Sequence, residues 1–236
     1  MLPNEARWFA KQADSLGDAA IFPMLNVGSH TAEFRATTQP WIDQYLFRPF
    51  AERGREVVHT DIQAAPGVDL VGDLTDPAFQ VELRSKKFRS AFCNNLLEHV
   101  TEPERICRAV AGAVEPGGYL FLSVPHRFPY HADPIDTMFR PSPEELAKLF
   151  PSTQIVVGEK LRCGNLTTYA AMRFAQNSKA MLHTIGDRLR GRTGADRTTE
   201  PQREAKLNEK SGSVFRFVPW LVRPFVITCL VLRVNA

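Results

Sequence analysis

FRSAFCNNLLEHVTEPERICRAVAGAVEPGGYLFLSVP, residues Phe88 to Pro125, is the segment around which the rest of the chain is organised. Ser90 to Cys93 is a short run of small and apolar residues, typical of a buried strand. From Ile106 to Val114, apolar residues recur at helical spacing, and Tyr119 to Val124 is a second apolar run rich in strand formers. A strand, a helix and a strand in this order predict a βαβ unit. Its two strands are expected to be parallel neighbours in a sheet that is covered on both faces.

The ends of the helices carry recognisable signals. Thr101 and Glu104 have the spacing of a capping box, and Pro116-Gly117-Gly118 is expected to stop the helix that follows them. Ser142 and Glu145 form a second predicted capping box, with a proline at the first helical position.

Apolar runs outside the central unit predict further strands. These runs are Met24 to Val27, Glu56 to Thr60, Val68 to Val71, Gln154 to Leu161 and Phe225 to Val234. Helical patterns lie between most of them, and residues 1–20 are expected to form a short polar helix with Trp8 and Phe9 as anchors. Alternation of strands and helices predicts a doubly wound α/β sheet.

Length and composition favour one globular domain over residues 1–236. Its core is expected at about 21–162 together with a last strand at 225–234. An insertion or lid is expected at about 165–215, with a helical part from Tyr169 to Ile185 and a polar loop, GRTGADRTTEPQRE, at 191–204. Residues 165–236 are predicted to hold the acceptor specificity, with the insertion as a lid; a mobile surface excursion is the alternative.

Charge and cysteine usage narrow the class of protein. A net charge of +3, with dispersed Lys and Arg, argues against a nucleic-acid partner. The four cysteines share no CxxC spacing, which favours a reduced, cytoplasmic protein, and the start MLPNEARWFAKQAD shows no export signal. The apolar run Val214 to Val234 is interrupted by arginines and prolines. Core packing explains this run better than contact with a membrane surface, which stays the alternative.

Ligands of such sheets bind beyond the carboxyl ends of the strands. Asp61 ends the second predicted strand, where a carboxylate can accept hydrogen bonds from a ribose diol. Asp73 follows the third strand and suits an amino group of adenine. The alternative for both residues is a turn or helix cap, although Asp76 already offers a cap beside Asp73.

The loop after the first strand argues against a phosphate ligand. The dinucleotide pattern requires glycine at three positions that here hold Gly28, His30 and Glu33, and no P-loop lysine is present. A nucleoside without phosphate therefore fits better, and a nicotinamide-dependent oxidoreductase is disfavoured.

The stretch AFCNNLLEHVTEPERICRAVAGAVEPGGYLFLSVPH, with HTDIQ, VGDLTD and HADPIDTMFRPSPEELAKLF, resembles the class I S-adenosylmethionine-dependent methyltransferases of the methyltransferase domain 11 type. The resemblance runs from about Met24 to Leu161, and Phe225 to Val234 resembles the family's last strand. It implies a Rossmann-like, seven-stranded sheet that is mostly parallel with one antiparallel strand and has helices on both faces. It also implies S-adenosylmethionine as the cofactor.

The resemblance assigns roles at the strand ends. Gly28 is expected to approach the methionine part of the cofactor, Asp61 to hold the ribose, and Asp73 with Leu74 to flank the adenine. Asn94 and Asn95 are expected near the sulfonium. The full set of predicted cofactor-binding residues is Asn26, Gly28, Ser29, His30, Asp61, Ile62, Asp73, Leu74, Asn94 and Asn95.

The first loop departs from the family pattern of an acid followed by alternating glycines. An amide, Asn26, stands where the acid is expected, and His30 adds a large side chain. Two hypotheses follow: a methyltransferase acting on a small-molecule or glycan-type acceptor, and a non-catalytic partner protein with the same fold.

Methyl transfer to a hydroxyl needs a base. His126 and His131, just after the fifth strand, are the predicted catalytic bases, with loop hydrogen bonding as the alternative. The pair Glu98-His99 is predicted to be structural, with Glu98 favouring the helix dipole. No residue spacing predicts a metal site.

Overall fold

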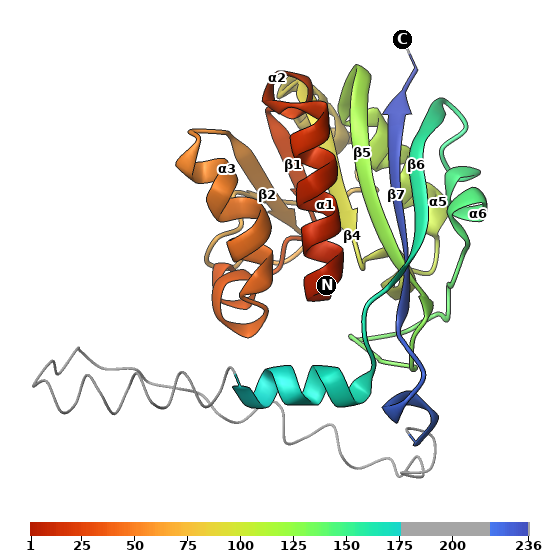
Figure 1. Ribbon diagram of the computed structural model, residues 1–236. Helices are drawn as coiled ribbons and strands as arrows, with labels where there is room; N and C mark the ends of the chain where they lie inside the picture. Colours follow the sequence, from red (N-terminus) through yellow and green to blue (C-terminus); the bar gives the residue numbers. More distant parts are fainter. Residues whose placement is uncertain (176–217, 236) are drawn as a thin grey trace, which may run out of the picture. The chain divides into compact units, whose positions relative to one another are not determined.

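Seven strands form one sheet in the computed structural model, which describes residues 1–175 and 218–235 (Figure 1). The strands are β1 (Met24–Val27), β2 (Val57–Asp61), β3 (Leu70–Val71), β4 (Phe88–Asn94), β5 (Val114–Arg127), β6 (Thr153–Arg162) and β7 (Val226–Val234). Their order in the sheet is β3-β2-β1-β4-β5-β7-β6. The first five strands in this order, from β3 across β2, β1 and β4 to β5, pair in parallel. Strand β7 runs antiparallel to both of its neighbours, β5 and β6. The predicted mostly parallel sheet with one reversed strand is confirmed.

Helices cover both faces of the sheet, as predicted (Figure 1). The α-helices are α1 (Pro3–Leu16), α2 (Asp18–Ile21), α3 (Arg48–Glu52), α4 (Pro77–Ser85), α5 (Pro103–Gly112) and α6 (Pro143–Ala147). Wide π-helical turns, η1 (Phe34–Thr38) and η2 (Asp43–Phe47), precede α3, and a 3-10 turn, η3 (Leu97–His99), precedes α5.

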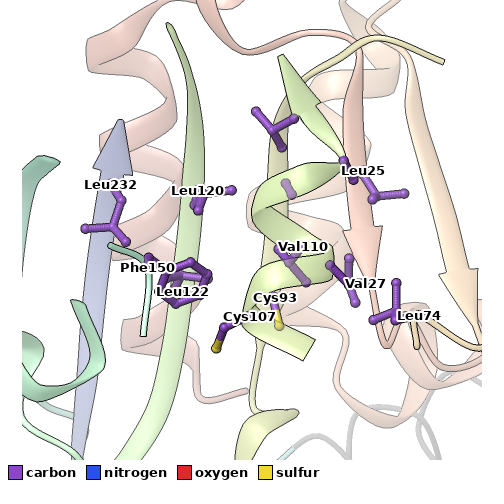
Figure 2. Close-up of a cluster of buried hydrophobic side chains, with 14 of the residues drawn as sticks. Leu25, Val27, Leu74, Cys93, Cys107, Val110, Leu120, Leu122, Phe150 and Leu232 are labelled. Carbon is purple, nitrogen blue, oxygen red and sulfur yellow. The ribbon is translucent and has the colours of Figure 1, made fainter. Parts of the chain in front are cut away.

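The main hydrophobic core lies between the sheet and the helices α4 to α6. Figure 2 shows Cys107 and Val110 of α5 facing Cys93, Leu120 and Leu122 on the neighbouring strands β4 and β5. All five residues are at most 1% exposed. Since side chains alternate along a strand, the residues between these point to the opposite face.

Helix α1 closes that opposite face. Phe9 is fully buried, and its ring lies 5.4 Å from Phe92 and 6.3 Å from Phe121, measured between centroids. Trp8 is also buried, and its indole N–H donates a 2.8 Å hydrogen bond to Glu159. The predicted anchoring role of Trp8 and Phe9 is therefore confirmed.

Two predicted helix boundaries around α5 are wrong. The N-cap is Glu102 rather than Thr101, and no side chain caps it, so the Thr101–Glu104 capping box does not form. The helix ends at Gly112, before the Pro116-Gly117-Gly118 turn. That turn instead forms a bulge in β5, because the pairing with β4 passes from Phe88↔Val114 directly to Ser90↔Tyr119.

The other predicted caps are confirmed. The Ser142 hydroxyl accepts a hydrogen bond from the Glu145 N–H at 3.2 Å, and the Glu145 carboxylate accepts one from the Ser142 N–H at 2.7 Å. Asp76 caps α4 by accepting from the Ala78 N–H at 3.0 Å.

The chain divides into two compact units. Residues 1–163 and strand β7 form one unit, and residues 164–225 form the other. The described parts of the second unit are a helix at 166–175 and the 3-10 turn η6 (Val218–Leu221), joined by a 2.7 Å hydrogen bond from the Thr167 hydroxyl to the Leu221 carbonyl. Most of the predicted insertion, including the loop at 191–204, lies outside the described residues, so the single-domain assignment stays a prediction.

The described helices include none with the length and apolar character needed to cross a membrane. The four cysteines are all free thiols, and Cys93, Cys107 and Cys229 are buried.

Candidate functional site

A cavity of about 390 Å³ opens beyond the carboxyl ends of β1 to β4. We call it the strand-end cavity. Several of the predicted cofactor-binding residues line it, namely Gly28, His30, Asp61, Ile62, Asp73, Leu74 and Asn95. The topology brings them together because parallel neighbouring strands place their carboxyl ends at one edge of the sheet. Three predicted residues, Asn26, Ser29 and Asn94, do not line it.

The loop after β1 has an unusual backbone. Gly28 and His30 both have positive φ angles, of 63° and 55°. At Gly28, a Cβ atom would lie 3.2 Å from the side chain of Leu96, another residue lining the cavity. The His30 ring stacks on Phe34 with centroids 4.1 Å apart, so a histidine occupies a conformation that glycine adopts at lower cost.

Arg35 stabilises this loop through hydrogen bonds to backbone carbonyl groups. Its guanidinium donates hydrogen bonds to the carbonyls of Ser29 at 2.9 Å, His30 at 2.7 Å and Gly67 at 2.7 Å. Arg35 is only 7% exposed, and burial lowers the pKa of its guanidinium. Sequence reasoning missed this residue because an arginine in a polar stretch gives no sign that it will be buried.

Asp61 connects the loop to the end of β2. Its Oδ2 accepts a hydrogen bond from the His30 N–H at 2.9 Å, and its Oδ1 accepts one from the Gln63 N–H at 3.2 Å. A carboxylate oxygen has two lone pairs, so each oxygen retains an acceptor position. Asp61 therefore has the capacity to accept hydrogen bonds from a ligand in the cavity while it holds the loop.

Asp73 lines the same cavity from the end of β3. Its Oδ1 accepts hydrogen bonds from the Thr75 N–H at 2.7 Å and from the Thr75 hydroxyl at 2.8 Å. These bonds lower the pKa of Asp73. The turn-capping alternative thus describes the hydrogen bonds of Oδ1. Leu74, next in the chain, adds an apolar wall.

The predicted residues outside the cavity have structural surroundings. The Asn26 amide nitrogen lies 3.0 Å from Nδ1 of His59. Burial lowers the pKa of His59 to about 4, so the ring is neutral at pH 7 and Nδ1 accepts the hydrogen bond. The Ser29 hydroxyl donates to the His30 carbonyl at 3.2 Å. The side-chain oxygen of Asn94 is buried without a hydrogen-bond partner among the described residues.

Asn95 lines the cavity, and its side chain is held by Glu5, a residue near the N-terminus. Its amide donates a 2.8 Å hydrogen bond to Glu5 of α1, a side chain that is fully buried. Glu5 also accepts from the Ser123 hydroxyl of β5. Sequence reasoning missed Glu5 because a lone acid in a polar helix looks like an exposed one.

The predicted catalytic histidines lie outside the cavity lining. His126 Nδ1 lies 3.1 Å from the Pro141 carbonyl oxygen. His131 Nδ1 lies 3.3 Å from Asp136, and burial lowers the pKa of His131. His99 does line the cavity, although the sequence predicts a structural role for it.

The predicted role of Glu98 at a helix start is wrong. Glu98 lies in η3, a separate turn before α5, and its side chain is fully buried. Burial raises its pKa to about 8. A protonated or charge-compensated carboxyl group therefore lies 3.8 Å from Nε2 of His99, a residue that lines the cavity.

Comparison with known proteins gives three kinds of likeness. Residues 44–122 match the family model described as a methyltransferase domain. A ubiquinone biosynthesis O-methyltransferase from Stutzerimonas stutzeri strain A1501 is 30% identical over 95 residues, which span 36% of this chain and 41% of that protein. The match thus spans less than half of the relative's length.

Two solved structures are similar to the chain. One is described as a SAM-dependent methyltransferase from Archaeoglobus fulgidus, with 12% identity, a TM-score of 0.49, and 97% of this chain and 94% of that chain covered. The other is a putative S-adenosylmethionine-dependent methyltransferase from Listeria monocytogenes, with 11% identity, a TM-score of 0.48, and coverages of 98% and 99%.

Proposed function

We propose that this chain is a class I S-adenosylmethionine-dependent methyltransferase and transfers a methyl group from S-adenosylmethionine to a hydroxyl of a small-molecule or glycan-type acceptor. The observation that carries the proposal is the pair Asp61 and Asp73. Asp61 ends β2, Asp73 lies two residues beyond the end of the neighbouring parallel strand β3, and both line one cavity with Gly28.

The residues that line the cavity fit the cofactor that the family implies. A volume of about 390 Å³ lies within the range of about 300–1,000 Å³ that small-molecule and cofactor sites occupy. Asp61 offers acceptor positions for the ribose hydroxyls, and Asp73 offers one for an amino group. Leu74, Leu96 and Ile106 supply apolar surface for the adenine ring.

The bound cofactor supplies an electrophilic methyl group on a sulfonium, and transfer is an in-line displacement. The protein's task is then to position the acceptor and exclude water. The Asn95 amide, held by Glu5, fixes the floor of the cavity. His99 and Asp133 line the side remote from β2 and β3, where we place the acceptor.

A hydroxyl acceptor is proposed because the related Stutzerimonas stutzeri protein is named an O-methyltransferase. His126 and His131 stay predicted bases, and neither lines the strand-end cavity. The rival function, a non-catalytic partner protein of the same fold, is supported by one contact. The His30 N–H already uses one acceptor position of Asp61.

Isothermal titration calorimetry with S-adenosylmethionine and S-adenosylhomocysteine separates the two functions. The wild-type protein is expected to bind at micromolar concentration, about −8 kcal/mol. Asp61→Ala is expected to abolish binding. Asp14→Ala, which removes an exposed aspartate paired with Arg53 at 3.4 Å, is the matched control and is expected to bind normally.

Absence of binding by folded wild-type protein would favour the partner protein. Normal binding by Asp61→Ala would show that the cofactor lies elsewhere. Acceptor screening with the methyl-labelled cofactor follows only after binding has been found.

A further inference from the structure

Three potential metal ligands gather beside the strand-end cavity, and the proposed function uses none of them as ligands. They are Glu98 and His99 of the turn η3 and His131 of the loop after β5. One ligand atom from each lies within 4.8 Å of the others, and Glu98 Oε1 is 3.8 Å from His99 Nε2. We propose that Glu98, His99 and His131 bind one divalent transition-metal ion.

Glu98 provides the first argument. Both of its carboxylate oxygens are buried and have no hydrogen-bond partner among the described residues. An ionised carboxylate is costly to bury unless a cation or hydrogen-bond donors compensate it. A bound divalent ion would supply that compensation. Arg140, the nearby cation, is already engaged with Asp136 at 2.6 Å.

The hydrogen bonding of the His99 ring leaves one ring nitrogen free to bind a metal ion. Its Nδ1 lies 2.6 Å from the Ile135 carbonyl oxygen, which can only accept, so Nδ1 carries the proton. In the neutral ring, the lone pair is then on Nε2, the atom that faces Glu98. Metal-binding histidines commonly donate their other N–H to a carbonyl or carboxylate in this manner.

His131 has the same kind of support. Its Nδ1 lies 3.3 Å from both the Asp136 carboxylate and the Pro129 carbonyl. These acceptors favour a proton on Nδ1 and leave the lone pair on Nε2. Asp136 is itself held by the His131 N–H at 3.0 Å and by Arg140. The cluster therefore has supporting hydrogen bonds around two of its three ligands.

The kinds of ligand atom in the cluster indicate which metal ions it would bind. Two imidazoles and one carboxylate suit Zn²⁺, Co²⁺ or Fe²⁺ better than Mg²⁺ or Ca²⁺, which prefer oxygen ligands. Ligand atoms about 2.1 Å from an ion lie about 3–3.5 Å apart. These three residues have ligand atoms within 4.8 Å of one another, so ion binding is expected to draw them closer together.

The position of the cluster suggests what the ion does, a step that rests on the proposed function. His99 also lines the cavity, so an ion bound to it would lie beside the part of the cavity where we place the acceptor. A Lewis acid there is suited to an acceptor whose oxygen must lose a proton. The acceptor class that follows is a hydroxyl or phenol of low acidity.

Metal binding by the full chain tests the proposal. The protein is treated with a chelator, dialysed and titrated with Zn²⁺ by calorimetry and with Co²⁺ by visible absorption. We expect one equivalent to bind, with a cobalt spectrum of nitrogen and oxygen ligands. Glu98→Gln, His99→Asn and His131→Asn are each expected to weaken binding at least about 10-fold. His126→Asn, which removes a histidine outside the cluster, is expected to leave affinity unchanged.

Three results would overturn the site: no uptake by the wild-type protein, equal affinity in all four variants, or a sulfur-to-cobalt charge-transfer band, which would indicate a cysteine ligand. Thermal melts show which variants are folded, and any one folded cluster variant suffices. S-adenosylmethionine titration of the same metal-free protein keeps the two proposals separate. Cofactor binding without metal uptake would reject only the metal site, and metal uptake without cofactor binding would reject only the proposed function.

Discussion

The backbone N–H of His30 donates a 2.9 Å hydrogen bond to Oδ2 of Asp61, so the loop after β1 is attached to the acid that ends β2. The contact joins the residue that departs most from the family pattern to the residue expected to hold the ribose. We therefore expect a change in the conformation of this loop to change the affinity for the cofactor.

His30→Gly is expected to tighten S-adenosylmethionine binding. Glycine adopts the positive φ of 55° without strain and removes the ring from the cavity wall. Calorimetry measures the affinity. Urea unfolding measures stability, which is expected to change little because the relieved backbone strain offsets the lost stacking on Phe34. Weaker binding by the variant would show that the ring contacts the cofactor.

Arg35→Met is expected to lower both stability and cofactor affinity. It leaves the carbonyls of Ser29, His30 and Gly67 without their charged donor. The expected loss is about 2–4 kcal/mol of unfolding free energy, measured in urea. Arg48→Met is the control, because Arg48 forms an exposed ion pair with Asp43 that is worth about 1 kcal/mol or less. Equal losses in the two variants would contradict the proposed support of the loop.

Glu98 is expected to make the metal-free protein less stable as the pH rises. Burial raises its pKa from 4.5 to about 8, so the folded state retains a proton that the unfolded state has lost. Stability then falls by about 1.4 kcal/mol per pH unit until the pH reaches the folded pKa. His59, whose pKa is lowered to about 4, has the opposite effect below pH 6.5. The Glu98 effect is therefore cleanest between about pH 6.5 and 8.

Urea unfolding of wild-type protein and Glu98→Gln, in chelator at pH 6.5 and pH 8, measures this effect. Glutamine resembles the protonated acid, so the variant should lack the decline and be the more stable protein at pH 8. Parallel pH dependences in the two proteins would show that Glu98 does not titrate in this range.

Ser142→Ala is expected to cost about 1 kcal/mol of unfolding free energy, because its hydroxyl caps α6. Thr101→Ala is the matched control and is expected to change stability by less than about 0.5 kcal/mol, since Thr101 caps no helix. The two residues have the same sequence signature. A larger loss for Thr101→Ala would mean that α5 begins earlier in solution.

Much of the strand-end cavity could be predicted from the sequence. Gly28, Asp61 and Asp73 follow recognisable apolar runs, and parallel strands necessarily gather such ends at one edge. Arg35 and Glu5 could not be found, because each acts through contacts with distant segments. The burial of Glu98 could not be predicted, because it depends on how η3 packs against distant segments and not on the residues next to it in the chain.

The amino-acid sequence alone was enough to predict the succession of strands along the chain, the helical and apolar periodicities, and the polar residues at the ends of the strands. These follow from local pattern, because buried faces must repeat with the period of their element. Which polar groups are buried, and which residues they contact, became known from the three-dimensional structure. His131 lies beside Glu98 and His99 because the loop after β5 folds back over η3. Such contacts depend on long-range packing, and no local spacing in the sequence records them.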